Sequence, residues 1–378
     1  MSAPHAGYGL EPTVRTPPGL RRMPTTRTVP ISHSGSFTPE ASAAIDVVEH
    51  INRHVIGTEL SCRTAAVQKL GSTIVSVEFA KPDHNYFIKF KRPQPQYGST
   101  VESTRASLTR EYVMLKWLAS TQPVSFAIPR PLYFDSENLV LATSAVPGTP
   151  FLSRYRLGPR LGVSQRDSLV RDLRAIGGAL GDFHRLSAPP ELEKASLHRQ
   201  AEARAGFMSR LDHDAIRSRP GLRSALLSRV DELTHAMDEG GEHALVHDDL
   251  GLHNVLCGAR PGFIDLDSVK LGPPEGDLAQ LILSLVDLTA PGPIPALRRR
   301  LLTRAIGALL EGYKAPAHQL KLKPYLLRTG LAWIIDLEIR RSHQVSRLRR
   351  LQDSLLLARQ QEFLIEVLTN SPHLAFAE

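Results

Sequence analysis

The residues whose types and spacing could do chemistry are Asp249, Asn254 and Asp265. Asp249 and Asn254 lie in the stretch 247–254, which reads HDDLGLHN, and Asp265 lies in the stretch 263–267, which reads FIDLD. Phosphoryl transfer needs a carboxylate that orients the attacking hydroxyl and oxygen ligands that hold Mg²⁺ against the phosphates. These three side chains could supply those groups, so the pattern indicates an enzyme that uses ATP.

Apolar runs around these residues predict how the chain brings them together. Residues 244–246 are typical of a short buried strand that ends where the polar stretch begins. The apolar run 255–257 and the glycine-bounded turn 258–262 predict a hairpin. Such a hairpin would return Asp265 to the neighbourhood of Asn254, so that both side chains could face one ion.

Downstream residues complete a family pattern. Pro273, Gly276 and the run 277–279 follow the stretches 247–254 and 263–267. Together they resemble the aminoglycoside phosphotransferase family of small-molecule kinases, whose architecture choline, homoserine and sugar kinases share. The resemblance implies an α+β, bilobal, protein-kinase-like fold with a small N-terminal β-rich lobe and a larger, mainly helical C-terminal lobe.

The same resemblance implies a role for each polar residue of the segment. Asp249 would be the catalytic base, and Asn254 and Asp265 would be the Mg²⁺ ligands. His247 would support the loop, and Asp277 would be a buried brace that hydrogen-bonds it. The cofactors implied are ATP and Mg²⁺.

Each of these residues also has an ordinary structural explanation. Asp and Asn before a hairpin commonly bond local backbone, so Asp249 or Asn254 alone would be a turn residue. Their fixed spacing between two strand-like runs favours the functional interpretation. For Asp267, a helper of the metal site and a solvated loop acid both remain open.

Three apolar runs upstream predict a nucleotide-binding sheet, namely residues 64–70, 73–79 and 85–90. Lys89 lies in the last run, where an ammonium is costly to bury unless a phosphate or a carboxylate meets it. We therefore predict that Lys89 contacts the phosphates of ATP. Lys91, which strand alternation puts on the same face, is the alternative.

A helix is predicted at residues 108–118, because apolar residues recur there at helical spacing. Its Glu111 resembles the glutamate that holds the strand lysine toward the phosphates, and a merely solvated glutamate is the alternative. Gly71 and Ser72 form the candidate for a phosphate-covering turn.

Two more strands, at 128–134 and 138–143, complete the predicted small lobe. Backbone groups from Ser144 to Val146 would contact adenine by position in the family pattern. Residues 169–186 then predict a large-lobe helix, with His184 as a packing residue at its end.

The sequence departs from the protein-kinase pattern in ways that matter for function. It has no GxGxxG near the first strands, no Asp-Phe-Gly after the hairpin and no Ala-Pro-Glu of an activation segment. A protein kinase is therefore a disfavoured alternative to a small-molecule kinase. Asp248 stands where the family usually has glycine and adds a negative charge beside Asp249. A catalytically silent binding module is thus a second alternative.

A basic cluster near the C-terminus bears on the acceptor. Arg340, Arg341 and the run 347–350 are predicted on a C-terminal helix, which in the family forms the substrate wall. Arg340, Arg341 or His343 would then line the acceptor pocket, with a solvated or bracing face as the alternative. Such a wall would repel a polycation, so we predict a neutral or anionic hydroxyl acceptor, such as a sugar, an amino alcohol or a related metabolite.

Length and composition agree with this organisation. The 378 residues are 42% hydrophobic and 22% charged, which is ordinary for a globular protein. We predict a disordered basic tail at 1–40, a nucleotide-binding lobe at 41–145 and a catalytic lobe at 146–378. The net charge of +8 is dispersed and lacks aromatic interleaving, so no nucleic-acid partner is expected. With no apolar run long enough for a membrane span and only two cysteines, a cytoplasmic location is expected.

Overall fold

The computed structural model describes residues 47–53, 62–69, 72–79, 85–93, 99–155, 162–189, 207–238, 243–288, 295–314, 322–343 and 347–369. The tail predicted at 1–40 and Gly71 of the predicted phosphate-covering turn lie outside the described residues.

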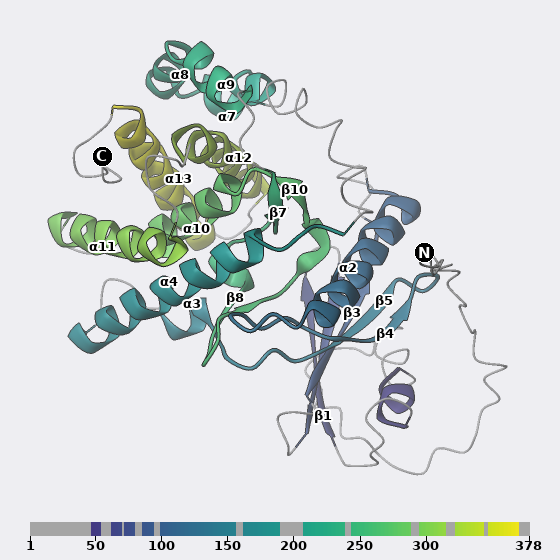
Figure 1. Ribbon diagram of the computed structural model, residues 1–378. Helices are drawn as coiled ribbons and strands as arrows, with labels where there is room; N and C mark the ends of the chain where they lie inside the picture. Colours follow the sequence, from purple (N-terminus) through teal and green to yellow (C-terminus); the bar gives the residue numbers. More distant parts are fainter. Residues whose placement is uncertain are drawn as a thin grey trace, which may run out of the picture.

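An antiparallel five-stranded sheet forms the N-terminal part of the described chain, with the strand order β1-β2-β3-β5-β4. The strands are β1 (Cys62–Lys69), β2 (Ser72–Phe79), β3 (Tyr86–Lys91), β4 (Pro131–Asp135) and β5 (Val140–Ser144). Figure 1 shows the sheet on the side of the molecule opposite most of the helices. The five strands predicted from the apolar runs are confirmed, with ends shifted by a few residues.

Strand alternation gives the sheet two different faces. Tyr86, Ile88 and Phe90 of β3 are buried on one face, where they pack with Val47 and Ile51 of a helical segment at 47–53. Lys89 and Lys91 therefore project from the opposite face, toward the helix that follows. The apolar pattern of the sequence did not predict this helical segment.

Helix α2 (Val101–Thr121) packs on the face of the sheet from which the lysines project. Thr100 caps its first turn, because its side chain accepts from the Ser103 N–H while the Ser103 hydroxyl accepts from the Thr100 N–H. Leu108, Met114 and Leu115 are buried on its inner side. Glu111 is buried among them, which makes a paired rather than a solvated carboxylate.

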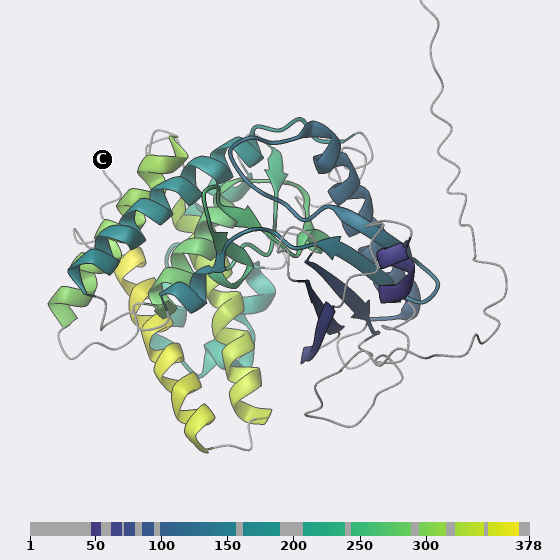
Figure 2. The ribbon, with the colours of Figure 1, turned by 90° about the horizontal axis from the view of Figure 1, so that it is seen from below.

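The C-terminal part of the chain is mainly helical, as Figures 1 and 2 show. Its helices are α3 (Phe151–Arg154), α4 (Val163–His184), α7 (Asp214–Arg217), α8 (Pro220–Leu227), α9 (Val230–Asp238), α10 (Glu275–Leu288), α11 (Pro295–Tyr313), α12 (Leu322–His343) and α13 (Arg347–Leu368). The predicted order, a β-rich part followed by a helical part, is confirmed. The basic cluster, predicted on one C-terminal helix, is divided between α12 and α13, which lie side by side in Figure 2.

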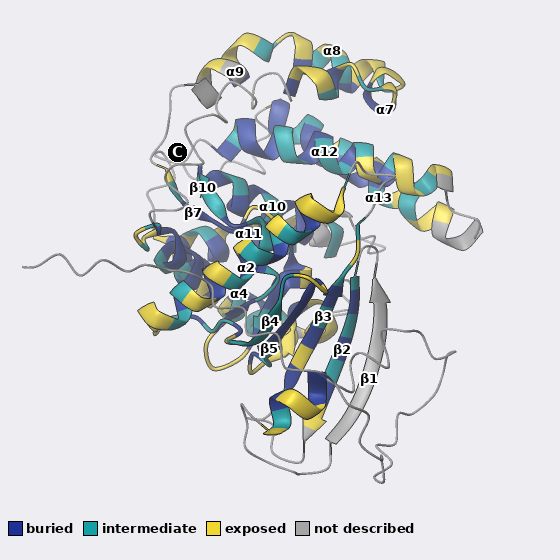
Figure 3. Ribbon diagram, turned by 90° about the vertical axis from the view of Figure 1, so that its right-hand side faces the viewer, coloured by how far each residue is buried: buried dark blue, intermediate teal, exposed yellow. Residues whose placement is uncertain are grey.

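Two small antiparallel sheets lie within the helical part of the described chain. β7 (Ala244–Val246) pairs with β10 (Lys270–Gly272), and β8 (Val255–Cys257) pairs with β9 (Gly262–Phe263) and β6 (Thr149–Pro150). The single-turn helices η5 (Leu252–Asn254) and η6 (Leu266–Ser268) connect them. Helix α10 follows directly and is buried over most of its length (Figure 3).

Helices α4 and α11 approach each other closely because glycines line their crossing. A β-carbon at Gly177 would lie 2.0 Å from the Leu309 carbonyl oxygen, and one at Gly312 would lie 1.9 Å from the Arg174 carbonyl oxygen. Both distances are far below van der Waals contact, so the crossing requires residues without side chains. No helix of the described chain is both long enough and apolar enough to span a membrane.

Candidate active site

The predicted hairpin brings Asp265 back to Asn254. β8 begins directly after Asn254, and Val255 pairs in register with Phe263 of β9. The ladder continues one step further, since the Ile264 N–H donates to the Asn254 carbonyl oxygen at 3.1 Å. Asp265 follows at once, with a left-handed backbone (φ 65°) that is uncommon for a residue other than glycine and is typical of functional sites.

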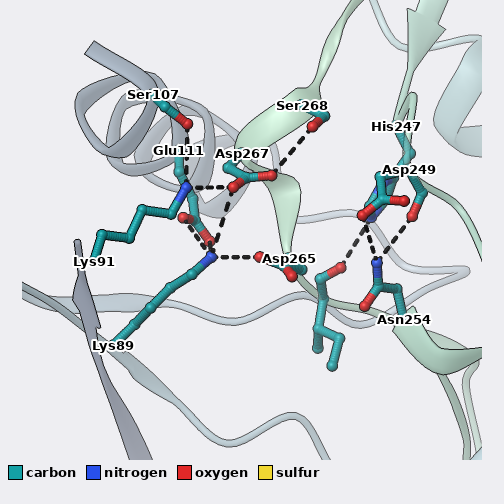
Figure 4. Close-up of polar contacts among 11 residues, drawn as sticks. Lys89, Lys91, Ser107, Glu111, His247, Asp249, Asn254, Asp265, Asp267 and Ser268 are labelled. Carbon is teal, nitrogen blue, oxygen red and sulfur yellow. Dashed lines mark hydrogen bonds and ion pairs between the residues drawn. The ribbon is translucent and has the colours of Figure 1, made fainter. Parts of the chain in front are cut away.

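Asn254 is anchored to Asp249. Its side-chain nitrogen donates to the Asp249 carbonyl oxygen at 2.9 Å and lies 3.4 Å from the Asp249 carboxylate oxygen Oδ2. Asn254 is buried, and the hydrogen bonds fix which end of its amide carries the nitrogen. Figure 4 shows its oxygen Oδ1 on the side away from Asp249, where it could serve as a metal ligand.

Lys89 joins the sheet to this loop through ion pairs with two carboxylates. Its ammonium lies 3.0 Å from Glu111 Oε2 and also donates to Asp265 Oδ1. Burial alone would lower the pKa of Lys89, but the carboxylates of Glu111, Asp265 and Asp267 raise it well above its ordinary value. The ammonium therefore stays charged at any physiological pH.

Asp267 pairs with the second lysine of β3. Lys91 donates to Asp267 Oδ2 and to the Ser107 hydroxyl of α2 at 3.1 Å. Carboxylate oxygens of Glu111, Asp265 and Asp267 lie within 4.8 Å of one another. Asp267 is therefore ion-paired within the site (Figure 4) and is not a solvated loop acid.

Asp277 of α10 holds the loop that carries Asp249. Its carboxylate accepts from the backbone N–H of His247 at 2.7 Å and of Asp248 at 2.8 Å. It also accepts from His184 Nε2 at 3.0 Å, and His184 Nδ1 bonds the Tyr313 hydroxyl at 2.8 Å. Burial alone would raise the pKa of Asp277, but these hydrogen bonds hold it below its ordinary value.

His247 connects the loop to the hairpin. Its backbone is held by Asp277, and its ring nitrogen Nε2 bonds the Ile264 carbonyl oxygen at 2.9 Å. Ile264 immediately precedes Asp265. The His247 ring therefore links the loop that carries Asp249 to the backbone next to Asp265. The predicted supporting position of His247 agrees with this geometry.

Asp249 faces outward from the loop and lies among acids. Partial burial raises the pKa of its carboxyl, His253 and His247 oppose the rise, and Asp265 and Asp267 add to it. A raised pKa makes a carboxylate a better proton acceptor while it remains ionised at neutral pH. The arrangement can therefore accept a proton from a hydroxyl placed against Asp249.

The predicted adenine and phosphate-turn residues lie at strand ends of the sheet. Ser72 begins β2 and pairs in register with Lys91, while Gly71 is not described. The Ser144 N–H donates to the Arg130 carbonyl oxygen and the Ala145 N–H to that of Asn85, both at 2.8 Å. These two N–H groups are engaged by neighbouring backbone, so the predicted base contact would fall to the carbonyl groups of Ser144 and Ala145 and to the backbone of the buried Val146.

Among the described side chains, no contact joins Arg340 or Arg341 to Asp249. Arg341 pairs with Glu338, which also pairs with Arg219 at 2.9 Å. Arg340 is exposed, and the His343 side chain is not described. A different residue of α12, Arg328, is close enough to Asp248 to lower the pKa of its carboxyl. Arg328 and Arg340 lie about 18 Å apart along the helix, at ~1.5 Å per residue.

Three supporting residues were missed in the sequence. Lys270 pairs with Asp248, Gln280 Nε2 donates to the Asp248 carbonyl oxygen at 2.8 Å, and Tyr313 bonds His184. The sequence analysis gave His184 only a packing role. The signal for Gln280 was its position three residues after Asp277 on one helix face, but Lys270 and Tyr313 depend on tertiary contacts.

Comparison with known proteins shows the family to which the chain belongs. The model of a family described as "Phosphotransferase enzyme family" matches residues 79–317, which is more than half of the 378-residue chain. The chain belongs to the phosphotransferase enzyme family. The matched part of this phosphotransferase contains Lys89, Glu111 and the whole segment from His247 to Asp277. No curated protein matches the sequence.

Solved structures share the fold of this phosphotransferase. The GDP and kanamycin complex of an aminoglycoside phosphotransferase is 14% identical, with a TM-score of 0.55 over 86% of this chain and 99% of that chain. The streptomycin and ATP complex of another is 17% identical, with a TM-score of 0.50 over 84% and 97%. A choline kinase from Cryptosporidium parvum Iowa II is 11% identical, with a TM-score of 0.50 over 88% and 99%. The predicted kinase-like α+β fold is confirmed.

Proposed function

We propose that this phosphotransferase transfers the γ-phosphoryl group of ATP, with Mg²⁺, to a hydroxyl group of a small molecule. The observation that carries the proposal is the convergence of Asp249, Asn254, Asp265 and Lys89 from separate elements. Phosphoryl transfer depends on positioning and on charge stabilisation, and these four side chains supply both.

The donor set suits a hard divalent cation. The side-chain nitrogen of Asn254 is engaged by Asp249, which leaves its oxygen for a metal, and Asp265 adds a carboxylate oxygen from the position just before η6. Oxygen donors with one or two carboxylates are what Mg²⁺ takes beside phosphates. We infer that Asn254 and Asp265 hold Mg²⁺, with Asp267 in a supporting position. When bound, Mg²⁺ neutralises charge on the phosphate oxygens.

Lys89 and Glu111 bind and orient the nucleotide in this proposal. Glu111 holds the ammonium from α2, so Lys89 points into the site from the middle of the sheet. The phosphates would receive the Lys89 ammonium, and the Asp265 carboxylate would then be available to hold the metal. The relatives solved with ATP and with GDP support a purine nucleotide as the donor.

Asp249 orients the acceptor and accepts its proton. The acceptor hydroxyl donates to a carboxylate oxygen of Asp249, its oxygen attacks the phosphorus, and the proton moves to Asp249 as the bond to ADP breaks. Asp277 and His247 keep the loop in place during this step, because they bond its backbone and the hairpin together.

The acceptor we propose is neutral or anionic. Two cations act on Asp248 of the loop, namely Lys270, which pairs with it, and Arg328, which lowers its pKa. A polycationic acceptor would meet both charges on its approach to Asp249, which disfavours it.

An acceptor screen with Mg-ATP tests the proposal. Panels of sugars, amino alcohols, phosphorylated or carboxylated alcohols and polycationic aminoglycosides would be compared, with ADP formation and phosphorylated product both measured. We expect a hydroxyl product with at least one neutral or anionic compound, and loss of nearly all turnover in Asp249→Asn. Undiminished transfer by that variant would remove Asp249 from its role.

The same assay separates the alternatives. A catalytically silent binding module would bind Mg-ATP without turnover. The backbone of Asp248 is accommodated by its hydrogen bonds, which argues against a distorted loop. A protein kinase is disfavoured because residues 265–277, all of them described, lead from the hairpin to α10 without an activation segment.

A further inference from the structure

Asp248 and Lys270 form an ion pair where two strands separate. The last residue pair between β7 and β10 is Val246 with Lys270. Beyond this pair, the strand β7 continues to Asp249, and the segment before β10 leads back to Asp265. We propose that the Asp248–Lys270 pair is a positioning device that sets the base Asp249 relative to the metal-binding Asp265, an inference that rests on the function proposed above.

The backbone of Asp248 is held from two sides. Its N–H donates to Asp277 Oδ1, and its carbonyl oxygen accepts from Gln280 Nε2, both at 2.8 Å. The carbonyl of Asp248 and the nitrogen of Asp249 share one planar peptide group. Fixing that plane therefore fixes the direction in which Asp249 leaves the loop.

The side chain of Asp248 supplies the third point of attachment. Asp248 has a left-handed backbone with φ 63°, which glycine adopts freely and which other residues adopt at a cost, aspartate and asparagine less than most. A glycine at this position would keep both backbone hydrogen bonds. Only a side chain such as that of Asp248 can also reach across the fork to Lys270 on β10.

The charge of Lys270 is needed as much as its reach. Partial burial raises the pKa of the Asp248 carboxyl, and the Lys270 ammonium is the largest opposing influence, with Arg328 adding a smaller one. Without Lys270, the Asp248 carboxylate would lie beside Asp249 and Asp277 with less of its charge compensated. Repulsion would then turn the loop, and a displacement of the base on the order of 1 Å costs up to about a hundredfold in rate.

Four variants and one control test the pair. They are Lys270→Met, Lys270→Arg, Asp248→Asn and the double variant Asp248→Asn/Lys270→Met, with Asp167→Asn as a control that breaks the exposed pair between α4 and α11 at Arg304. Measured for each are kcat and KM for Mg-ATP turnover, with the best acceptor of the screen or with water as acceptor, the Kd for Mg-ATP, and the melting temperature.

We expect Lys270→Met to lower kcat about tenfold and to change the Kd for Mg-ATP less than about twofold, because orientation is lost and nucleotide contacts are kept. Lys270→Arg should restore kcat to within about threefold of wild type. The double variant should be no slower than Lys270→Met, since neighbouring residues that act together do not add. Asp167→Asn should leave kcat unchanged.

Two results would overturn the inference. One is a wild-type kcat in Lys270→Met. The other is additivity, in which the loss of kcat in the double variant, expressed as activation free energy, equals the sum of the losses in the two single variants. A wild-type chain that binds Mg-ATP and turns nothing over would remove the proposed function together with this role. Turnover by the wild type that is indifferent to Lys270 would remove the positioning role alone.

Discussion

Asp277 and His184 are joined by a buried hydrogen bond of 3.0 Å although 93 positions separate them in the chain. His184 ends α4, and Asp277 lies in the first turn of α10. The Asp277 carboxylate also accepts from two backbone N–H groups of the loop that carries Asp249. The scaffold of the large helical part and the chemistry of the site therefore meet at a single fully buried carboxylate.

Asp277→Ala should cost about 3 kcal/mol of unfolding free energy, because two backbone N–H groups and His184 lose a buried partner. Urea unfolding measures this loss. Asp182→Ala, which removes an exposed acid of α4 paired with Arg185, is the control and should cost less than about 1 kcal/mol. Equal losses in the two variants would contradict the bracing role.

Lys89→Met should weaken Mg-ATP binding at least about tenfold, because the three carboxylates around it would then repel the triphosphate. Titration calorimetry with a non-hydrolysable ATP analogue measures the Kd. Lys91→Met is the matched control on the same strand face and should weaken binding by no more than about threefold, since Lys91 pairs with Asp267 and Ser107. A larger effect at Lys91 would exchange the two assignments.

Asp265→Asn should raise the Mg²⁺ concentration needed for half-maximal turnover at least about tenfold, because a charged oxygen ligand becomes neutral. Turnover measured across a Mg²⁺ series at fixed ATP shows this directly. Asp267→Asn should shift the same curve less, since Asp267 is held by Lys91. Identical curves for wild type and Asp265→Asn would place the metal elsewhere.

Gly312→Ala should destabilise the protein by about 3 kcal/mol or more, because its methyl group would lie 1.9 Å from the Arg174 carbonyl oxygen. Gly307→Ala on the same helix meets nothing within 4 Å and should be neutral or stabilising by up to about 1 kcal/mol. Thermal melting of the pair measures both effects. A tolerated Gly312→Ala would mean that α4 and α11 separate at little cost.

Asp287 should make stability depend on pH. Burial raises its pKa to about 6, and in the unfolded chain the value is near 4. The native state therefore holds a proton more tightly, and stability falls as pH rises from about 4 through 6. Asp287→Asn keeps an acceptor for Gln360 Nε2 and removes this dependence. Its gain in unfolding free energy should be about 2 kcal/mol larger at pH 7.5 than at pH 4.5.

The sequence contained enough to predict the local elements of the site. Alternation in β3 separated Lys89 from its buried neighbours, and the glycine-bounded turn predicted that Asp265 would return to Asn254. Such features depend on residues within a few positions of one another. Glu111 lies 22 positions from Lys89, and only the family resemblance pointed to that pair.

The rest depended on contacts that no local pattern carries. Lys91 meets Asp267 across 176 positions, and Tyr313 reaches His184 across 129. Basic residues of the C-terminal helices were assigned to the acceptor pocket by their charge, but a helix presents Arg328 and Arg340 about three turns apart. The packing of α12 against α10 decides which end of α12 approaches the loop, and the composition of the helix does not.

The Lys89 ammonium lies between the carboxylates of Glu111 and Asp265. A bare magnesium ion that enters would have to compete with a cation already seated among those oxygens. A magnesium ion chelated to a triphosphate would bring anionic phosphate oxygens with it. Those oxygens could pair with the Lys89 ammonium and leave the Asp265 carboxylate for the ion. We therefore expect metal and nucleotide to load together, as one complex, with free metal a poor ligand on its own.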